Sequence, residues 1–141
     1  MPQSKSLRVI IDTNIFISFL IGKELTGLKD MLVEGEVILI LSEELLNEIK
    51  SVTQREKLAK YFSIEKVNEL LELLIIIGKK VNVKSKVNIS RDISDNFLLA
   101  LAKDSKADYL ITGDKDLLTI KTFRKTKIIS YRDFSKIVKL N

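Results

Sequence analysis

The segment LRVIIDTNIFISFL, residues 7–20, carries the pattern that decides the fold. Residues 7–11 form a short, almost continuous apolar run rich in β-branched side chains, which is typical of a strand buried on both faces of a parallel sheet. Apolar side chains then recur at helical spacing at Ile15, Phe16, Phe19 and Leu20. We therefore expect the chain to leave a strand at Asp12 and to turn directly into a helix.

The same change from an apolar run to a helical pattern recurs along the chain. Residues 37–41 predict a second strand, and Ser42 behind them is a good N-cap for a helix. Residues 54–77 predict one helix, or two with a break at 61–63, ending at Gly78. The later elements expected are an alternating strand over 81–87, a helix capped by Asp92 or Ser94, strands over 108–112 and 128–129, and a C-terminal helix capped by Ser130 and Asp133.

This alternation of strands and helices predicts an α/β sandwich with a mostly parallel central sheet. The chain has 141 residues with one proline and five glycines, and no repeat or linker-like stretch, so a single domain over residues 1–141 is expected. No stretch approaches the ~18 to 20 apolar residues of a membrane span, and no apolar signal region precedes the first carboxylate. We therefore expect a cytoplasmic protein with no membrane partner.

The composition excludes several kinds of catalytic and metal site. The sequence has no cysteine and no histidine. Zinc fingers, thiol nucleophiles, serine-histidine-aspartate triads and two-histidine metalloprotease sites each need a thiolate or an imidazole, so these sites are excluded. The 24 Lys and Arg exceed the 19 Asp and Glu, and this formal charge of +5 permits an anionic partner such as nucleic acid.

Three aspartates are expected at one edge of the sheet. In an open α/β sheet, ligands bind beyond the carboxyl ends of the strands, and Asp12 and Asp114 each follow a predicted strand. Asp95 shares a helix face with the apolar residues three, four and seven positions later, so its side chain is expected to point inward. A carboxylate that points inward needs a partner.

The helix expected after Ser42 offers a fourth acid, and two glutamates compete for that role. At about 100° per residue from Leu45, Glu48 lies about 60° from the apolar face and Glu44 about 100°. Glu44 also lies in the first turn, where the helix dipole already stabilises an acid. Glu48 is therefore favoured, and Glu44 remains the alternative.

Four carboxylates at one site would repel one another and raise their pKa values unless a cation lies among them. Because the chain offers no imidazole or thiolate, the expected cation is a hard, oxygen-preferring ion such as Mg²⁺ or Mn²⁺. Such an ion lowers the pKa of its bound water and stabilises charge on a phosphoryl oxygen. The acids therefore favour metal-assisted hydrolysis of a phosphodiester.

The same acids also have structural explanations. The two aspartates that follow strands could be a cap or a turn residue, the inward aspartate a first-turn acid, and Glu48 a surface residue. Asp92 and Asp116 are assigned mainly as cap and turn residues. The basic residues in 79–86 and 121–127 could bind phosphate, although a solvated face is the commoner explanation. The apolar stretch at 70–77 is assigned to the core, with a homodimer surface as the alternative.

Four segments resemble, in order and spacing, the four acidic motifs of PIN domains. They are IIDTNIFIS at 10–18, SEELLNEI at 42–49, RDISDNFLLALA at 91–102 and ADYLITGDKDLL at 107–118. The resemblance spans residue 7 to about residue 131, is weakest over 50–90, and is nearest to the toxins of toxin-antitoxin pairs, akin to VapC-type toxins. It implies a three-layer α/β/α fold whose acids bind Mg²⁺ or Mn²⁺ and cut single-stranded RNA, usually as a homodimer neutralised by a cognate antitoxin.

The resemblance also implies roles for individual residues. The catalytic and metal-binding acids of the family match Asp12, Glu48, Asp95 and Asp114, an acidic neighbour that helps through water matches Asp116, and polar positions that orient the first and last acids match Asn14 and Thr112. The leading hypothesis is a Mg²⁺- or Mn²⁺-dependent endoribonuclease that is the toxin of such a pair. The alternative is a non-catalytic module of the same fold that binds RNA or protein. A phosphoacceptor receiver domain is a third idea, which leaves Glu48 and Asp95 unexplained.

Overall fold

The computed structural model describes residues 6–21, 34–55 and 57–139, without the side chains of residues 19–21 and 139. In chain order the elements are β1 (Leu7–Ile11), α1 (Thr13–Ile21), β2 (Val37–Leu41), α3 (Glu43–Thr53), α4 (Ile64–Ile77), β3 (Lys79–Lys80), α5 (Ile93–Ser105), β4 (Tyr109–Ile111), α6 (Lys115–Ile120), β5 (Thr122–Phe123), β6 (Thr126–Ile129) and α7 (Tyr131–Lys139). The strands predicted at 7–11 and 37–41 are confirmed, as are the helices behind them. The predicted apolar contacts of Phe19 and Leu20 lie outside the described side chains.

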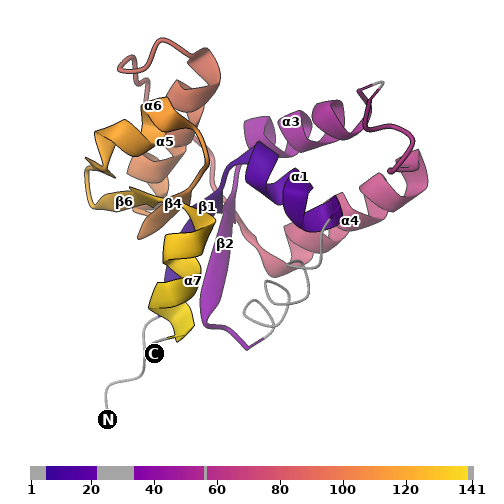
Figure 1. Cartoon of the computed structure of the whole chain (residues 1–141), viewed down its shortest axis with the longest axis horizontal. Coiled ribbons are helices and arrows are strands. Elements are labelled where there is room, and N and C mark those ends of the chain that lie inside the picture. The colour runs from indigo at the N-terminus through magenta and orange to yellow at the C-terminus, as the bar shows by residue number, and fades with distance from the viewer. Residues whose placement is uncertain (1–5, 22–33, 56, 140–141) are drawn as a thin grey trace.

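The six strands form one sheet in the order β3-β2-β1-β4-β6-β5, parallel except for β5 against β6 (Figure 1). The strands β1 and β4 lie at its centre, with Val9 opposite Tyr109 and Ile11 opposite Ile111. The side chains of Val9, Ile10 and Ile11 are buried on both faces. This burial explains why β1 is apolar except for Arg8 and has no alternating polar face.

Helices cover both faces of the sheet. The chain moves from β1 to β2 to β3 in one direction, and then crosses back to β4 and β6 in the other. Because parallel crossovers are right-handed, this reversal puts α1, α3 and α4 on one face and α5 and α6 on the opposite face, as Figure 1 shows. The fold is therefore the expected three-layer α/β/α sandwich. The C-terminal helix α7 packs on β4, where the Phe134 and Tyr109 rings meet edge to face at 5.6 Å.

The strand predicted over 81–87 is wrong. Only Lys79 and Lys80 pair with β2, and the N–H of Val81 donates the last bond, to the carbonyl of Leu41. The chain after β2 turns into α3 at once, so no strand remains for residues 82–87 to pair with. The α5 side chain of Asp104 accepts the N–H groups of Lys84 and Ser85 instead. Side-chain acceptors thus replace a β-ladder here.

The region 54–77 contains one helix rather than two. Residues 54, 55 and 57–61 form turns, and α4 begins after Ser63, whose hydroxyl caps it by accepting the N–H of Lys66. The helix ends before Gly78, as predicted. Residue 78 must be a glycine because the space beside it is filled: a Cβ here would lie 2.7 Å from the Leu41 side chain and 2.8 Å from the Leu74 carbonyl.

The apolar stretch at 70–77 is only partly core, which corrects its assignment. Leu74 is buried and Leu70 and Leu71 are half-buried. Leu73 and the three isoleucines at 75–77 are exposed. No helix within residues 6–21, 34–55 and 57–139 is both long and apolar enough to cross a bilayer.

Candidate functional site

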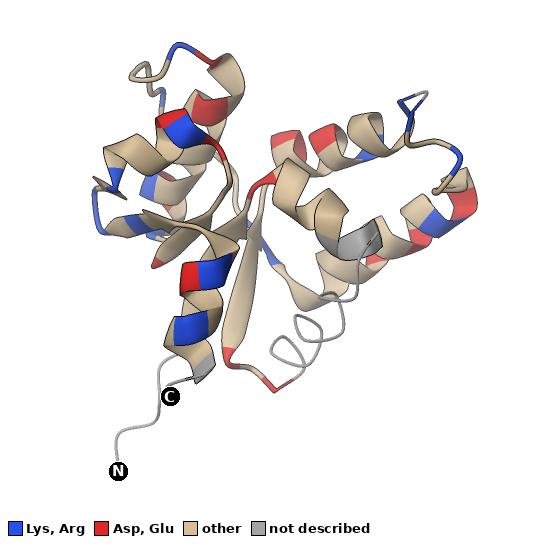
Figure 2. Cartoon of the chain, in the orientation of Figure 1, with Lys and Arg blue, Asp and Glu red and all other residues tan. Residues whose placement is uncertain are grey.

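The site lies where the strand order reverses. The neighbouring strands β1 and β4 lead to helices on opposite faces of the sheet, which opens a crevice beyond their carboxyl ends. Asp12 directly follows β1, and Asp114 follows β4 after two residues. The two aspartates predicted from the strand pattern therefore meet at this edge. In Figure 2 acidic residues gather between α3 on one side and α5 and α6 on the other.

Thr112 connects these two acids. Its hydroxyl donates to Asp12 Oδ2 at 2.7 Å and accepts the N–H of Asp114 at 3.0 Å. The backbone N–H of Asp12 donates to the carbonyl of Ile111 at 2.9 Å, which fixes the end of β1 against β4. Thr112 is fully buried, and these two hydrogen bonds use its hydroxyl once as donor and once as acceptor. Thr112 therefore contacts the Asp12 carboxylate and the backbone of Asp114, and its role in orienting the first and last acids stays a prediction.

Asp12 and Asp95 are both buried carboxylates with raised pKa values. Burial raises the pKa of Asp12, against hydrogen bonds from Thr112 and the Asn14 backbone that lower it, and the charge of Asp114 adds to the increase. Asp95 is 3% exposed. Burial, together with the negative charges of Asp114 and Asp92, raises its pKa to about 6, although the Ser90 hydroxyl donates to Oδ2 at 3.1 Å.

The tightest group of acids consists of Asp92, Asp95 and Asp114. Each offers one oxygen, and these oxygens lie within 4.8 Å of one another. An all-carboxylate donor set is what Mg²⁺ and Mn²⁺ prefer. Burial raises the pKa of Asp95 most, the charges of Asp114 and Asp92 add to it, and a cation among the three acids would offset that repulsion. The residues present therefore fit a hard divalent cation. Asp12 lies outside this group and is connected to it through Thr112 and Asp114.

Three helices each begin directly after one of the acids at this edge of the sheet. Asp12, Asp92 and Asp114 immediately precede α1, α5 and α6, and Asp92 and Asp114 each accept backbone N–H groups as N-caps. Helix N-termini carry partial positive charge, which stabilises neighbouring anions. The capping explanations considered for these residues are therefore correct geometrically, and they coexist with the acidic group.

The structure shows two supporting residues that the sequence did not reveal. Asn96 accepts the N–H groups of Ile89 and Ser90 with Oδ1, and its amide donates to the Ser90 carbonyl. This holds the loop before α5 so that the Ser90 hydroxyl reaches Asp95. Neither residue lies on a periodic pattern, and the only available signal was a polar side chain next to a predicted acid. Asp92 was assigned mainly as a cap and was not among the predicted site acids, although its carboxylate lies in the acidic group.

The two competing glutamates of α3, Glu44 and Glu48, line one hollow beside the acidic group. Its walls come from α3 and α5, and its lining residues are Ser42, Glu44, Leu45, Glu48, Ser94, Phe97, Leu98 and Leu101. Glu48 is half-buried and Glu44 is exposed, in agreement with their predicted distances from the apolar face. Neither carboxylate belongs to the group of three aspartates.

The remaining predicted residues lie at the rim. Asp116 is exposed, and its Oδ2 lies 3.6 Å from the guanidinium of Arg91. Asn14 contacts Asp12 through its backbone N–H, at 3.4 Å. Lys80 pairs with Glu43, and Lys125 pairs with Asp108. Part of the predicted basic rim is therefore neutralised locally.

The sequence was compared with known families and proteins. A family model described as PIN domain matches residues 8–116. The uncharacterized protein MJ1680 of Methanocaldococcus jannaschii is 35% identical over 140 residues, which cover 96% of this chain and 81% of that protein. The range matched by the family model includes the first three acidic segments and the fourth as far as Asp116.

Two solved structures are similar in fold. VapBC2 from Rickettsia felis, solved bound to a DNA fragment from its promoter, aligns with a TM-score of 0.58 at 13% identity, over 86% of this chain and 97% of that chain. PAE2754 from Pyrobaculum aerophilum aligns with a TM-score of 0.62 at 15% identity, over 98% of this chain and 99% of that chain. At these identities the similarity shows the architecture.

Proposed function

The chain belongs to the PIN domain family, and from this premise we propose that it is a metal-dependent endoribonuclease that hydrolyses single-stranded RNA in the cytoplasm. PIN domains are generally metal-dependent nucleases. The single observation that carries the proposal is the convergence of Asp92, Asp95 and Asp114 oxygens within 4.8 Å, with no imidazole or thiolate in the chain.

The proposed roles follow from the geometry of the acids. Asp95 and Asp114 hold a Mg²⁺ or Mn²⁺ ion, and Asp92 joins them. Asp12 shares the site through Thr112, and Glu48 completes the acidic set from α3. When bound, the ion would lower the pKa of a water molecule and stabilise negative charge on a phosphoryl oxygen.

The chain itself contributes position and protonation state. Thr112 donates to Asp12 and keeps one carboxylate oxygen fixed, while Ser90 does the same for Asp95. The positive ends of three helices favour the ionised acids, which a cation needs. Asp116 lies in the first turn of α6, where its exposed carboxylate can accept a proton through water.

We further propose that the protein is the toxin of a toxin-antitoxin pair, with a cognate antitoxin as its protein partner. Similarity in fold to VapBC2 supports this partner class. The proposed homodimer has a candidate surface in the exposed Leu73 and the isoleucines at 75–77 of α4. Large exposed apolar patches mark association sites. Ile76→Glu is therefore expected to convert a dimer to a monomer in light-scattering measurements.

The test compares the wild type, Asp12→Asn and Asp133→Asn on a mixed single-stranded RNA with Mg²⁺, Mn²⁺ or EDTA. Asp133 is the matched control, since it is an exposed first-turn acid of α7 away from the acidic group. We expect metal-dependent cleavage by the wild type and the control, and none by Asp12→Asn. Cleavage by Asp12→Asn at the wild-type rate would show the residue assignment to be wrong. RNA binding without cleavage by any protein would instead indicate the non-catalytic module.

A further inference from the structure

Large apolar side chains are exposed beside the acidic group. Ile89, Ile93 and Phe97 are 59%, 74% and 49% exposed. Ile93 and Phe97 lie one turn apart on α5 and share an exposed face of the helix, whereas Asp95 lies on its buried face. Exposed apolar surface at the rim of a site calls for a ligand that is itself apolar on one face.

The hollow between α3 and α5 brings Phe97 and the acids together. Ser94, Phe97, Leu98 and Leu101 line it at the spacing of one helix face, and Ser94 directly precedes Asp95. The hollow is open to solvent and has a volume of about 100 Å³. Its floor is apolar, and Glu44 and Glu48 stand on its α3 wall. This is the composition of a site for a flat, partly apolar group with polar edges.

We propose that this hollow receives one base of the single-stranded RNA, next to the cleaved phosphate, with the Phe97 ring as its stacking platform. The inference rests on the proposed function, because the acidic group fixes where the phosphate lies. Bases of single-stranded RNA are unstacked and stack on aromatic side chains. Phe97 lies near the start of α5, whose N-cap Asp92 belongs to the acidic group, and it shares the hollow with Glu48, so a base on its ring belongs to a nucleotide near the site of hydrolysis.

The charges around the hollow agree with a base and not a phosphate. Two carboxylates in its α3 wall would repel a phosphate, whereas a base is neutral. Arg91, which directly precedes Asp92, lines a separate hollow with Ile89, Asp116 and Ile120. The phosphate backbone is therefore directed to the Arg91 side, and the base to the Phe97 side.

Glu44 gives the hollow a preference among bases. An ionised carboxylate only accepts hydrogen bonds, so it favours a base edge that presents an exocyclic amine. Adenine, cytosine and guanine carry such an amine, and uracil presents carbonyl oxygens instead. Because Glu48 is assigned to the acidic set, the exposed Glu44 is the residue free to meet this edge.

The first experiment measures cleavage and binding of a single-stranded RNA oligonucleotide that carries 2-aminopurine beside the cleavage site. Phe97→Ala is expected to raise KM, and Kd in EDTA, by about 5- to 150-fold with kcat changed less. Phe97→Tyr keeps the platform and is expected to behave as the wild type. Phe97→Leu keeps apolar volume without the aromatic face and is expected to resemble the alanine variant. Quenching of 2-aminopurine on binding reports stacking directly.

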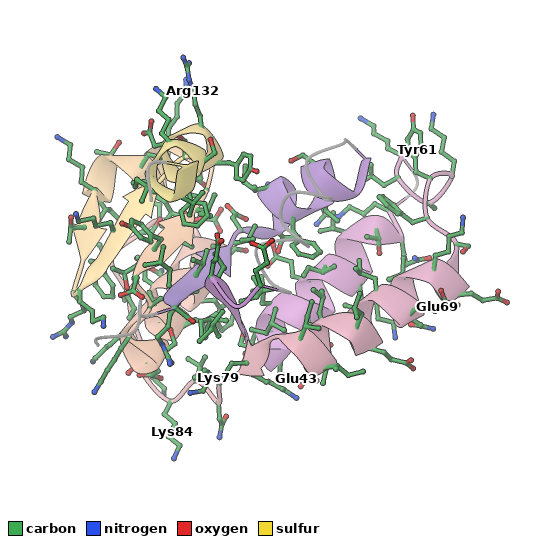
Figure 3. The ribbon with its side chains drawn as sticks, turned by 90° about the horizontal axis from the view of Figure 1, so that it is seen from below. Glu43, Tyr61, Glu69, Lys79, Lys84 and Arg132 are labelled. Atoms are coloured by element: carbon green, nitrogen blue, oxygen red, sulfur yellow. The ribbon has the colours of Figure 1, made fainter. Side chains whose placement is uncertain are left out.

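Tyr61→Ala is the matched control, because it removes another exposed aromatic ring at the far end of the α3–α4 side of the molecule (Figure 3). Its KM and Kd are expected to stay at wild-type values. Equal KM values for Phe97→Ala and the wild type, or equal losses in both alanine variants, would overturn the platform. Wild-type values for Phe97→Leu would also overturn stacking.

The two proposals fail in different ways. If the wild type cuts no RNA but the 2-aminopurine signal depends on Phe97, the nuclease assignment fails and the base site stands. If the wild type cuts RNA and Phe97→Ala cuts it equally well, only the base site fails. If the wild type neither cuts nor binds RNA, both fail.

A second experiment varies the single base beside the cleavage site. The wild type is expected to have lower KM for adenine, cytosine or guanine than for uracil, and Glu44→Gln to reduce that preference, because an amide can also donate. Glu43→Gln is the control, since Glu43 pairs with Lys80 and does not line the hollow. Equal KM for all four bases with the wild type would overturn the role of Glu44.

Discussion

Replacing Asp95 with asparagine is expected to stabilise the metal-free protein at neutral pH. The carboxylate of Asp95 is buried beside two other acids, and its pKa rises from 3.8 to about 6. A pKa difference of one unit corresponds to about 1.4 kcal/mol, so keeping this group ionised in the fold costs up to about 3 kcal/mol. Asparagine removes the charge, and its Oδ1 can still accept the Ser90 hydroxyl.

The sign of the pH dependence follows from the raised pKa of Asp95. The folded protein holds the proton of Asp95 more tightly than the unfolded chain, so this contribution to stability is full below pH 3.8 and decreases as the pH rises to about 6. The raised pKa of Asp12 acts in the same direction. The lowered pKa of Asp104 acts mainly below pH 3.8. The chain has no histidine to titrate in the same range.

Thermal unfolding in EDTA at pH 4.5 and pH 7.5 tests this reasoning. At pH 7.5 the Tm of Asp95→Asn is expected to exceed that of the wild type by roughly 5–10 °C, and the gap should narrow at pH 4.5. Mg²⁺ should raise the Tm of the wild type more than that of the variant. An unchanged or lower Tm for Asp95→Asn at pH 7.5 would refute the free-energy cost of keeping the Asp95 carboxylate ionised in the fold. Asp104→Asn is the control and should lower the Tm, because its carboxylate holds backbone N–H groups.

Three further predictions concern stability and are measured by urea unfolding. Thr112→Val should lose about 1–3 kcal/mol, because its buried hydroxyl has two partners, whereas Thr13→Val should change stability little, because the buried Thr13 hydroxyl has no partner among the described residues. Equal losses would contradict this contrast. Gly78→Ala should lose about 1–3 kcal/mol, since its Cβ would lie 2.7 Å from the Leu41 side chain, and a neutral result would show that this contact relaxes. Phe134→Ala should lose about 3–5 kcal/mol, because this fully buried ring joins α7 to the sheet, and a loss below 1 kcal/mol would contradict that role.

The central strands could be predicted to the residue because burial on both faces leaves an unmistakable pattern. Residues 37–41 are apolar throughout and residues 7–11 are apolar except for Arg8, and the cap at Ser42 marks the next helix. The two-residue strand β5 is too short to have a period. The failure at 81–87 has another cause, since alternation fixes which side chains are half-buried but cannot show whether a partner strand exists.

The acids could be found from the sequence because topology fixes their place. Asp12 and Asp114 follow strands that neighbour each other, and Asp95 lies on the buried face of its helix. Ser90 and Asn96 could not be found, because a loop side chain gains its partner only through the path of the loop. The assignment of Glu48 over Glu44 depends on a small angular difference.

Asp92 was underrated for a reason that applies to the whole site: capping and ligation were treated as exclusive. Asp92 caps α5 through Oδ1, Asp114 caps α6 through Oδ1, and Asp95 binds Ser90 through Oδ2. A carboxylate has two oxygens, so each acid can hold the fold with one and offer the other to a cation. The site is then organised before a cation binds, and the helix starts need not change on binding.

Asp114 allows these two duties to be separated. Asp114→Asn should keep the cap of α6, because asparagine caps as well as aspartate, whereas Asp114→Ala should lose about 0.5–2 kcal/mol of stability. Both variants remove the charge, so both should lose metal-dependent cleavage. The measurement pairs urea unfolding with the cleavage assay for each variant. If Asp114→Asn cut RNA at the wild-type rate, the site would need the cap alone, and if both variants were equally stable, the carboxylate would contribute to the site without holding the helix.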